Sequence, residues 1–438
     1  MTQTHRSGPQ LRRAVLSSYL GSVIEYYDFL LYATASALVF NKVFFSNLDP
    51  LVGTVASFGT LATGYFARPL GGIVFGHFGD RIGRKKMLVL SMTIMGLGST
   101  LIGLLPTYAQ IGVWAPILLV LLRVLQGIAI GGEWGGAVLM SAEHATSRRG
   151  LWASFTNAGA PSGLVLSSLV LAASASFTGE AAFLAWGWRI PFLLSVVLLA
   201  VGLFVRARVA ETPVFEDAAR EKPASPPLME VLRHHPRNLL LSIGVGFAAF
   251  AVQGTLTTFV ISYAVQAGFP RPTVLNALTL SSVVAIFGIV GFSALSDRVG
   301  RRPVVLAGAA ATGLFAFLLF PMIDSGAVLL LTLAVVIGQG VLHPAMYGPL
   351  AALYAELFST RSRYTGASLG YQIAGIGAGI APVVFASVLA GGGGSVTVAI
   401  ILAACCLLTI VCTVALRETS SDDLADDPGV TAGATVNR

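Results

Sequence analysis

The sequence is short of charge. Only 11% of its 438 residues are Asp, Glu, Lys or Arg, whereas 55% are hydrophobic, and the mean hydropathy is +0.80. A soluble globular protein carries about 25% charged residues, which it needs to cover its surface. The composition therefore predicts an integral membrane protein.

Cysteine and the common catalytic motifs are also scarce. The three cysteines, Cys405, Cys406 and Cys412, fall in one apolar stretch without paired spacing or a nearby histidine, which excludes a disulfide framework and a zinc site. The chain has no Gly-x-x-x-x-Gly-Lys-Ser/Thr loop, which excludes a primary pump with that phosphate-binding motif. We expect no enzyme, no metal and no cofactor.

Long apolar runs dominate what is present. Windows of about 20 residues, the length of a membrane-spanning helix, predict an all-α protein with twelve transmembrane helices. The predicted spans are 17–41, 54–78, 87–105, 116–141, 150–174, 187–207, 239–266, 275–296, 304–322, 327–355, 365–389 and 396–416.

The basic residues indicate the orientation of these spans. If the N-terminus is cytoplasmic, twenty-two of the 27 Lys and Arg residues lie on the inner side and three on the outer side. Such an excess is the positive-inside pattern. It predicts a multi-pass protein of the cell membrane with both termini in the cytoplasm. The net charge of +7 is then explained by the basic residues on the inner side, not by a nucleic-acid partner. We expect a monomer whose partners are lipid, protons and a small molecule.

The chain contains an internal repeat. The run Gly76–Lys86 recurs at Ser293–Arg302, displaced by 217 residues, and Gln126-Gly127 recurs at Gln339-Gly340, displaced by 213. The repeat predicts two pseudo-symmetric six-helix bundles, as in rocking-bundle transporters. The expected parts are a cytoplasmic tail (1–16), an N-terminal bundle (17–207), a cytoplasmic linker (208–238), a C-terminal bundle (239–416) and a disordered tail (417–438).

Several motifs resemble those of a known family. The two copies of the loop motif, with Arg123-Val-Leu-Gln-Gly127, resemble the major facilitator superfamily. Ile24–Phe29, Phe66–Gly72, Gly131–Gly136 and Trp186–Phe192 resemble motifs of its bacterial metabolite:proton symporters, which include carriers for shikimate, proline and betaine, α-ketoglutarate and citrate. The resemblance implies the major facilitator fold and import of a small polar metabolite by proton symport with alternating access.

The resemblance favours an organic acid, either shikimate-like or a dicarboxylate, as the substrate. Three alternatives stay open: a proton-coupled efflux antiporter, a symporter for a zwitterion such as proline or betaine, and a membrane sensor that transports nothing. Uptake of a solute panel under an imposed pH gradient would separate them.

Five charged residues fall well inside the predicted spans, all in the first half: Glu25, Asp28, Arg68, Arg123 and Glu133. A charge within a membrane is costly and marks a functional or paired site. Burial favours the protonated form of a carboxyl group, so we expect these five to form a proton-coupling site. Structural ion pairing remains an alternative for the three acids, and Arg123 suits a substrate-carboxylate clamp as well as a counter-charge.

The second half has only neutral hydrogen-bonding groups in its spans. We expect Gln253, His343, Tyr347 and Gln372 to bind the substrate, together with Tyr32 and Arg123 of the first half. A packed, purely structural histidine is the alternative for His343. Because Pro344 follows His343, and Gly348-Pro349 lies one turn further on, the tenth span is predicted to be kinked or broken. The hypothesis is that the first half handles protons and the second selects the substrate.

The repeated loop motif predicts a conformational latch. An Asp at the end of a helix, followed by basic residues, can bond across to a neighbouring helix end. The candidate residues are Asp80, Arg81, Arg84 and Glu143 in the first half, and Asp297, Arg298, Arg301 and Glu356 in the second. Fixed packing between helices is the alternative, but two copies at equivalent positions favour a latch that breaks when the inner face opens.

Overall fold

Helices are the only regular elements in the part of the chain that the computed structural model describes, residues 8–82, 84–144, 147–207, 227–358 and 363–420. The first half comprises α1 (Gly8–Leu38), α2 (Phe40–Val43), α3 (Pro50–Ile82), α4 (Arg84–Leu104), α5 (Tyr108–Ile111), α6 (Trp114–Gly131), α7 (Trp134–His144), α8 (Arg149–Thr178), α9 (Glu180–Ala182), the π-helix η1 (Phe183–Gly187) and α10 (Arg189–Ala207).

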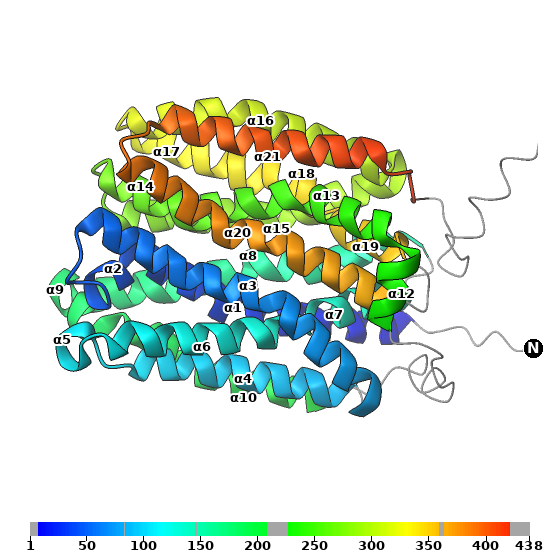
Figure 1. Ribbon diagram of the computed structural model, residues 1–438, viewed down its shortest axis with the longest axis horizontal. Helices are drawn as coiled ribbons and strands as arrows, with labels where there is room; N and C mark the ends of the chain where they lie inside the picture. Colours follow the sequence, from blue (N-terminus) through cyan, green and yellow to red (C-terminus); the bar gives the residue numbers. More distant parts are fainter. Residues whose placement is uncertain (1–7, 83, 145–146, 208–226, 359–362, 421–438) are drawn as a thin grey trace, which may run out of the picture.

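The second half begins with α12 (Pro227–His234). It continues with α13 (Pro236–Gly254), η2 (Thr255–Phe259), α14 (Val260–Gln266), α15 (Arg271–Val299), α16 (Arg301–Asp324), α17 (Val328–Val335), η3 (Val336–Leu342), α18 (His343–Tyr347), α19 (Leu350–Glu356), α20 (Arg363–Ala390) and α21 (Ser395–Ala415). Figure 1 shows the long helices running the length of one bundle.

The predicted spans correspond to these helices. Nine segments of the described chain are long and apolar enough to cross a membrane by length and composition, from Trp114–Leu139 to Ser395–Ala415. With α1, α3 and α4, which cross the same bundle, they account for all twelve predicted spans. Large apolar side chains lie on the outside of the bundle. Examples are Phe177, Phe287 and Leu314, which are 90%, 73% and 75% exposed. Apolar groups outside and charges inside are what a lipid environment requires.

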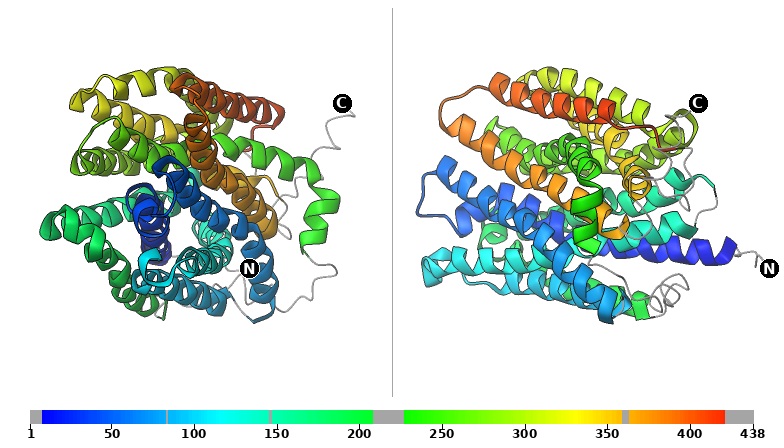
Figure 2. Two further views of the ribbon diagram at one scale, coloured as in Figure 1. Left: turned by 60° about the vertical axis from the view of Figure 1, so that its left-hand side comes forward. Right: turned by 45° about the vertical axis from the view of Figure 1, so that its right-hand side comes forward.

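The helix pairings of the first half recur in the second. In the first half α1 packs on α8, α3 on α6 and α4 on α10. In the second, α13 packs on α20, α15 on η3 and α16 on α21. Across the halves, α3 packs on α20 and α8 on α15. The two contacts are equivalent, because α3 corresponds to α15 and α8 to α20 in the internal repeat. Both views of Figure 2 show the two halves side by side.

Both chain ends of the bundle lie on one side. α1 begins, and α21 ends, at the end of the bundle where α12 also lies (Figure 1); we call it the terminal end. The predicted linker is partly helical, because α12 occupies 227–234 and α13 already begins at Pro236, a residue suited to the first turn of a helix. Residues 208–226 and 421–438 of the predicted linker and tail lie outside the described residues.

Several predicted spans are not one continuous α-helix, and two of the interruptions contain candidate site residues. The predicted span 116–141 is two helices, because a turn at Gly132-Glu133 separates α6 from α7. A Cβ atom on Gly132 would lie 2.3 Å from Cβ of Phe75, so this turn lets α3 approach. The predicted break of the tenth span is confirmed, since η3, α18 and α19 replace one continuous α-helix there.

Candidate functional site

Two buried arginines lie at the centre of the first half. Arg68 of α3 and Arg123 of α6 are 2% and 0% exposed. The Phe29 ring of α1 contacts both guanidiniums, with its centroid 4.0 Å from Cζ of Arg68 and 3.7 Å from Cζ of Arg123. Tyr65 stacks on Arg68 at 4.4 Å and Tyr32 on Arg123 at 4.2 Å. These contacts hold the guanidiniums through their faces, by cation–π attraction.

Glycines bring the two arginines together. A Cβ atom on Gly127 of α6 would lie 2.1 Å from the backbone oxygen of Gly64 of α3, and one on Gly64 would lie 2.6 Å from Nε of Arg123. No larger residue fits at either position without displacing a helix. The Gly residues therefore let the two helices touch backbone to backbone and leave room for the Arg123 side chain.

Stacking leaves most of the guanidinium donors unused. Nε and Nη2 of Arg68, and Nε and Nη2 of Arg123, are buried without a hydrogen-bond partner among the described residues. The predicted alternative, a structural ion pair between Arg68 and a first-half acid, would occupy such donors; within the described chain, Nε and Nη2 of Arg68 make no such bond. A buried charged group without partners is costly. Two nitrogens of Arg68 and two of Arg123 are therefore open to a further hydrogen-bond acceptor.

Neutral polar side chains lie between Arg123 and Asp28. Nη1 of Arg123 donates to Oε1 of Gln126 (3.2 Å), and Nε2 of Gln126 donates to Oγ of Ser99 (2.8 Å). Oγ of Ser195 donates to Oδ1 of Asp28, and Ser99 lies beside the same carboxyl group. Asp28 is 2% exposed. Gln126 and Ser99 thus stand between the guanidinium of Arg123 and the carboxyl group of Asp28.

The other first-half candidates lie around this cluster. Glu25 is on α1, one turn before Asp28, and is 8% exposed. Glu133 is buried in the turn between α6 and α7, where Oγ of Ser91 donates to its Oε2 (3.5 Å). The hydroxyl of Tyr32 donates to Oγ1 of Thr60 (2.7 Å), so only the ring of Tyr32 faces Arg123.

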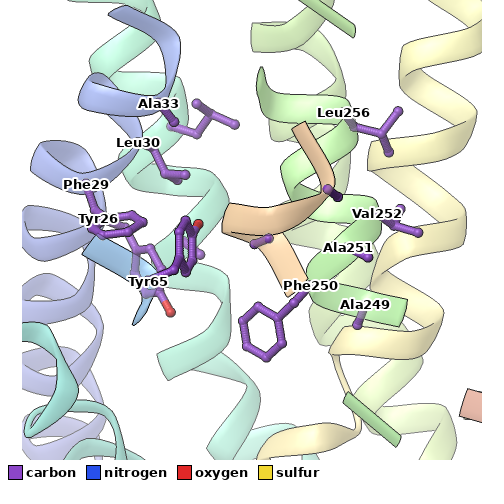
Figure 3. Packing of buried hydrophobic residues seen from close by; sticks show 14 of the residues in the cluster. Tyr26, Phe29, Leu30, Ala33, Tyr65, Ala249, Phe250, Ala251, Val252 and Leu256 are labelled. Atoms are coloured by element: carbon purple, nitrogen blue, oxygen red, sulfur yellow. The ribbon is translucent and has the colours of Figure 1, made fainter. Parts of the chain in front are cut away.

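Three tyrosines join the two halves next to the arginines. Oη of Tyr371 lies 2.8 Å from Oη of Tyr26 and 2.6 Å from Oη of Tyr347. The Trp134 ring stacks on Tyr371 at 3.6 Å. Figure 3 shows Tyr26 and Phe29 of the first half facing Phe250 of the second. Since Tyr26 precedes Phe29 by one turn on α1, this tyrosine triad (Tyr26, Tyr347 and Tyr371) separates the arginines from the terminal end.

Removing the central hydroxyl of the triad should loosen that closure. Tyr371→Phe keeps the stacked ring but deletes two hydrogen bonds, each worth about 1 kcal/mol. We expect roughly tenfold faster hydrogen–deuterium exchange in α7 and in the first turns of α20. Tyr354→Phe is the matched control, because its hydroxyl donates to Ser242 within the second half. Equal exchange in the two variants would show that the triad does not hold the halves together.

The second-half candidates separate into two places. Gln253, His343 and Tyr347 line one small cavity, together with Gln339, which the sequence analysis did not select. Gln372 lies elsewhere, since its Nε2 donates to the backbone oxygen of Gly131 (3.2 Å) across the interface between the halves.

The second copy of the predicted latch forms a charge network at the terminal end. Arg301 pairs with Asp297 (2.7 Å) and with Glu356 (3.0 Å). Asp297 also accepts hydrogen bonds from the backbone N–H groups of Gly150 (2.8 Å) and Leu151 (2.9 Å), which begin α8 of the other half. Arg298 is exposed and is not part of this network. The side chains of the remaining latch candidates lie outside the described part of the structure: Asp80, Arg81, Arg84 and Glu143.

The segment after α21 is tied to the same network. Glu418 accepts hydrogen bonds from the backbone N–H groups of Arg301 (2.8 Å) and Arg302 (3.0 Å) at the start of α16. Oγ1 of Thr419 donates to Oε2 of Glu356 (2.7 Å). Partial burial raises the pKa of Glu418, but the backbone N–H groups outweigh it and hold the pKa below its ordinary value of 4.5.

Glu418→Gln should destabilise the protein in a pH-dependent way. A carboxylate with a lowered pKa contributes stability that is complete above its ordinary pKa and is lost as the pH falls through the lowered value. Loss of such a helix cap costs about 1 kcal/mol. We therefore expect a lower thermal midpoint at pH 7 and a smaller difference from the unmodified protein below pH 4.5. A difference that is the same at both pH values would contradict the assignment.

The sequence did not indicate the site residues whose contacts are made with side chains of other helices. Phe29 lies inside the Ile24–Phe29 motif, but nothing in the spacing indicates that it contacts two arginines. Ser99 and Ser195 are single serines in apolar spans, a weak signal that only their buried positions make specific. Gln339 could have been found, because it occupies the position equivalent to Gln126 in the internal repeat.

The described residues include no group of three or more His, Cys, Asp or Glu side chains that could hold a metal ion. The cluster of Arg68, Arg123 and Asp28 lies inside the first half, and a Cβ atom on Gly375 of the second half would lie 3.7 Å from Nη1 of Arg68. In general, guanidinium groups suit an anion and a buried carboxyl group favours its protonated form.

Comparison with known proteins agrees with this arrangement. The profile of the Major Facilitator Superfamily matches residues 19–382 and 278–435. A shikimate transporter of Escherichia coli (strain K12) is 39% identical over 384 residues, covering 86% of this chain and 88% of the relative. A proline/betaine transporter of the same strain is 32% identical over 429 residues, covering 95% and 85%.

The fold comparison points the same way. A solved structure of the proton:xylose symporter XylE bound to 6-bromo-6-deoxy-D-glucose superposes with a TM-score of 0.73 at 18% identity, over 95% of this chain and 98% of that one. At this identity the likeness concerns the fold alone. The sequence match, the twelve-helix fold and the relatives together show that the chain is a multi-pass membrane transporter of the Major Facilitator Superfamily.

Proposed function

We propose that the protein imports a carboxylate metabolite together with protons, and that Arg68 and Arg123 bind the carboxylate. The observation that carries the proposal is the pair of buried guanidiniums whose Nε and Nη2 atoms have no partner in the described chain. A guanidinium presents its donors in a planar fork that matches a carboxylate. Stacking on Phe29, Tyr32 and Tyr65 keeps those forks oriented without using the donors.

The position of Asp28 close to Arg123 supports coupling to protons. An ionised Asp28 supplies negative charge close to Arg123 and weakens the attraction of the guanidinium for a second anion. Protonation of Asp28 removes that charge, so the anion binds more tightly, and by linkage the bound anion favours protonation. Proton and carboxylate then bind together and leave together, which is the requirement for symport. Glu25 and Glu133 are the second choices for the proton site.

The same geometry argues against a betaine-like substrate. A quaternary ammonium is recognised by the faces of aromatic rings, but the rings of Phe29, Tyr32 and Tyr65 are already covered by guanidiniums. The relative named as a shikimate transporter makes shikimate the first acid to test. Alternating access would use the contacts between the halves, with the tyrosine triad and the Asp297–Arg301–Glu356 network as closures at the terminal, cytoplasmic end.

Transport by the purified protein in proteoliposomes tests the proposal. With an acidic exterior and an alkaline interior, we expect labelled shikimate to accumulate and labelled betaine not to accumulate. Dissipating the pH gradient with a protonophore should abolish accumulation but spare exchange of labelled for unlabelled acid. Accumulation of betaine alone, or loss of preloaded acid driven by the inward proton gradient, would contradict carboxylate symport.

A further inference from the structure

A small polar cavity lies between the two halves. It has a volume of about 10 Å³ and is closed on one side by Leu30 of α1 and Pro161 of α8. Its polar wall belongs to the second half and consists of Gln253, Gln339, His343 and Tyr347. A space of this size admits about one water molecule, or one hydroxyl group.

Three polar atoms of this wall have no hydrogen-bond partner in the described chain: Oε1 of Gln339, and Nδ1 and Nε2 of His343. Both side chains are 2% exposed. The backbone of Ala249 approaches the imidazole, but neither ring nitrogen has a hydrogen bond of ordinary geometry. The ring is fixed by stacking on Tyr347 at 5.1 Å. An unsatisfied buried polar atom is unfavourable, so these atoms point to a missing hydrogen-bonding group.

The chemistry of the wall selects that group. The amide oxygen of Gln339 accepts only, while a neutral imidazole has one donor and one acceptor nitrogen. A hydroxyl group both donates and accepts, and so matches this set. A carboxylate only accepts and an ammonium only donates, and no charged side chain lines the cavity to balance either.

The internal repeat explains why this wall is neutral. Gln339 is equivalent to Gln126, but Gln126 uses its amide to join Arg123 to Ser99, whereas Oε1 of Gln339 is free. The residue equivalent to Arg123, displaced by the same 213 positions, is Val336. Gln126 of the first half therefore belongs to a charged network, whereas the equivalent Gln339 of the second half lines an uncharged cavity.

The cavity and the carboxylate site have neighbours in common. Tyr347 lines the cavity, and its hydroxyl belongs to the tyrosine triad next to the arginines. Leu30, which also lines the cavity, directly follows Phe29, whose ring contacts both guanidiniums. Figure 3 shows Phe29 and Leu30 in succession on α1.

We infer that the cavity is a hydroxyl-recognising subsite, in which Gln339 and His343 bind a hydroxyl group of the transported acid. The transported class is then a hydroxylated carboxylic acid. This inference rests on the proposed carboxylate transport and adds the group that discriminates among acids. A site built to pair a hydroxyl discriminates strongly against an analogue that lacks it, because its buried polar atoms are then left unpaired.

Equilibrium binding to the purified full-length protein tests the subsite. The two probes are shikimate and cyclohex-1-ene-1-carboxylate, which share the ring and carboxylate and differ in the hydroxyl groups. We expect the unmodified protein to bind shikimate at least about tenfold more tightly. Gln339→Met and His343→Phe should each remove most of that preference by weakening shikimate binding, with cyclohexenecarboxylate binding unchanged. Gln266→Met, outside the cavity, is the matched control, and melting curves verify that each variant is folded.

The outcomes separate this subsite from the carboxylate site. Equal affinity of the unmodified protein for the two acids would overturn the subsite and leave the carboxylate site standing. Loss of affinity for both acids alike in Gln339→Met and His343→Phe would also overturn it, since those residues would then act on the shared carboxylate and ring. Binding of neither acid by the folded, unmodified protein would overturn both proposals.

Discussion

Arg123→Lys should bind the carboxylate substrate about ten- to hundredfold more weakly than the unmodified protein. Loss of one charge-assisted hydrogen bond reduces affinity by about this factor. Lysine keeps the positive charge, but it loses the planar fork and the stacking on Phe29 and Tyr32 that orients the guanidinium. Arg68→Lys should behave in the same way, because its Nε and Nη2 are equally free. Equilibrium binding of labelled shikimate to the purified variants measures the effect.

Arg233→Lys is the control, since Arg233 is exposed on α12 and far along the chain from the site. If Arg123→Lys binds the substrate with unchanged affinity but loses gradient-driven accumulation, Arg123 acts in proton coupling and not in substrate binding. A conserved affinity in both lysine variants would refute the carboxylate clamp.

Asp28→Asn should lose gradient-driven accumulation almost completely and retain exchange. For each coupled proton, a pH gradient of about two units can sustain about hundredfold accumulation of an acid. The neutral amide imitates the protonated carboxyl group, so the arginines remain available to the substrate, but no proton is taken up or released. We therefore expect an accumulation ratio near one in Asp28→Asn proteoliposomes, with counterflow of labelled against unlabelled acid still present.

Glu25→Gln and Glu133→Gln are the informative comparisons, because both acids are buried near the same cluster. Asp324→Asn is the control, as Asp324 is exposed and accepts a hydrogen bond from Tyr263 away from the site. If Asp28→Asn accumulates substrate normally while one of the two glutamine variants does not, the proton site belongs to that glutamate.

The sequence predicted the helices well, because one-dimensional signals determine them. Length and apolarity locate a span, and Pro344 after His343 was sufficient to predict the break in the tenth span. The turn at Gly132-Glu133 was not predicted, because Gly is common inside membrane helices. The close approach of Phe75 to Gly132 is visible only in the packed structure.

The partners of each charge could be predicted far less well. Helical spacing places Asp28 on a face of α1, but not which residues of other helices that face meets. The link from Asp28 to Ser195 joins residues 167 positions apart, and that from Arg301 to Glu356 joins residues 55 positions apart. Likewise, the sequence indicated that Arg68 and Arg123 are buried, but only the packing of α3 on α6 shows that they share one aromatic ring.

The hydrogen bonds between the halves have a thermal consequence. In the described chain they lie at the tyrosine triad or nearer the terminal end, including those to Asp297, Gly131 and Gly132. Beyond the arginines, contacts such as Gly379 on Tyr65 are apolar. Opening the end opposite the terminal end therefore hydrates apolar surface and carries a positive heat-capacity change, whereas opening the terminal end mainly exchanges hydrogen bonds with water. Because apolar contacts weaken on cooling, lower temperature favours the form that is open opposite the terminal end. The free-energy difference between the two forms then varies non-linearly with temperature.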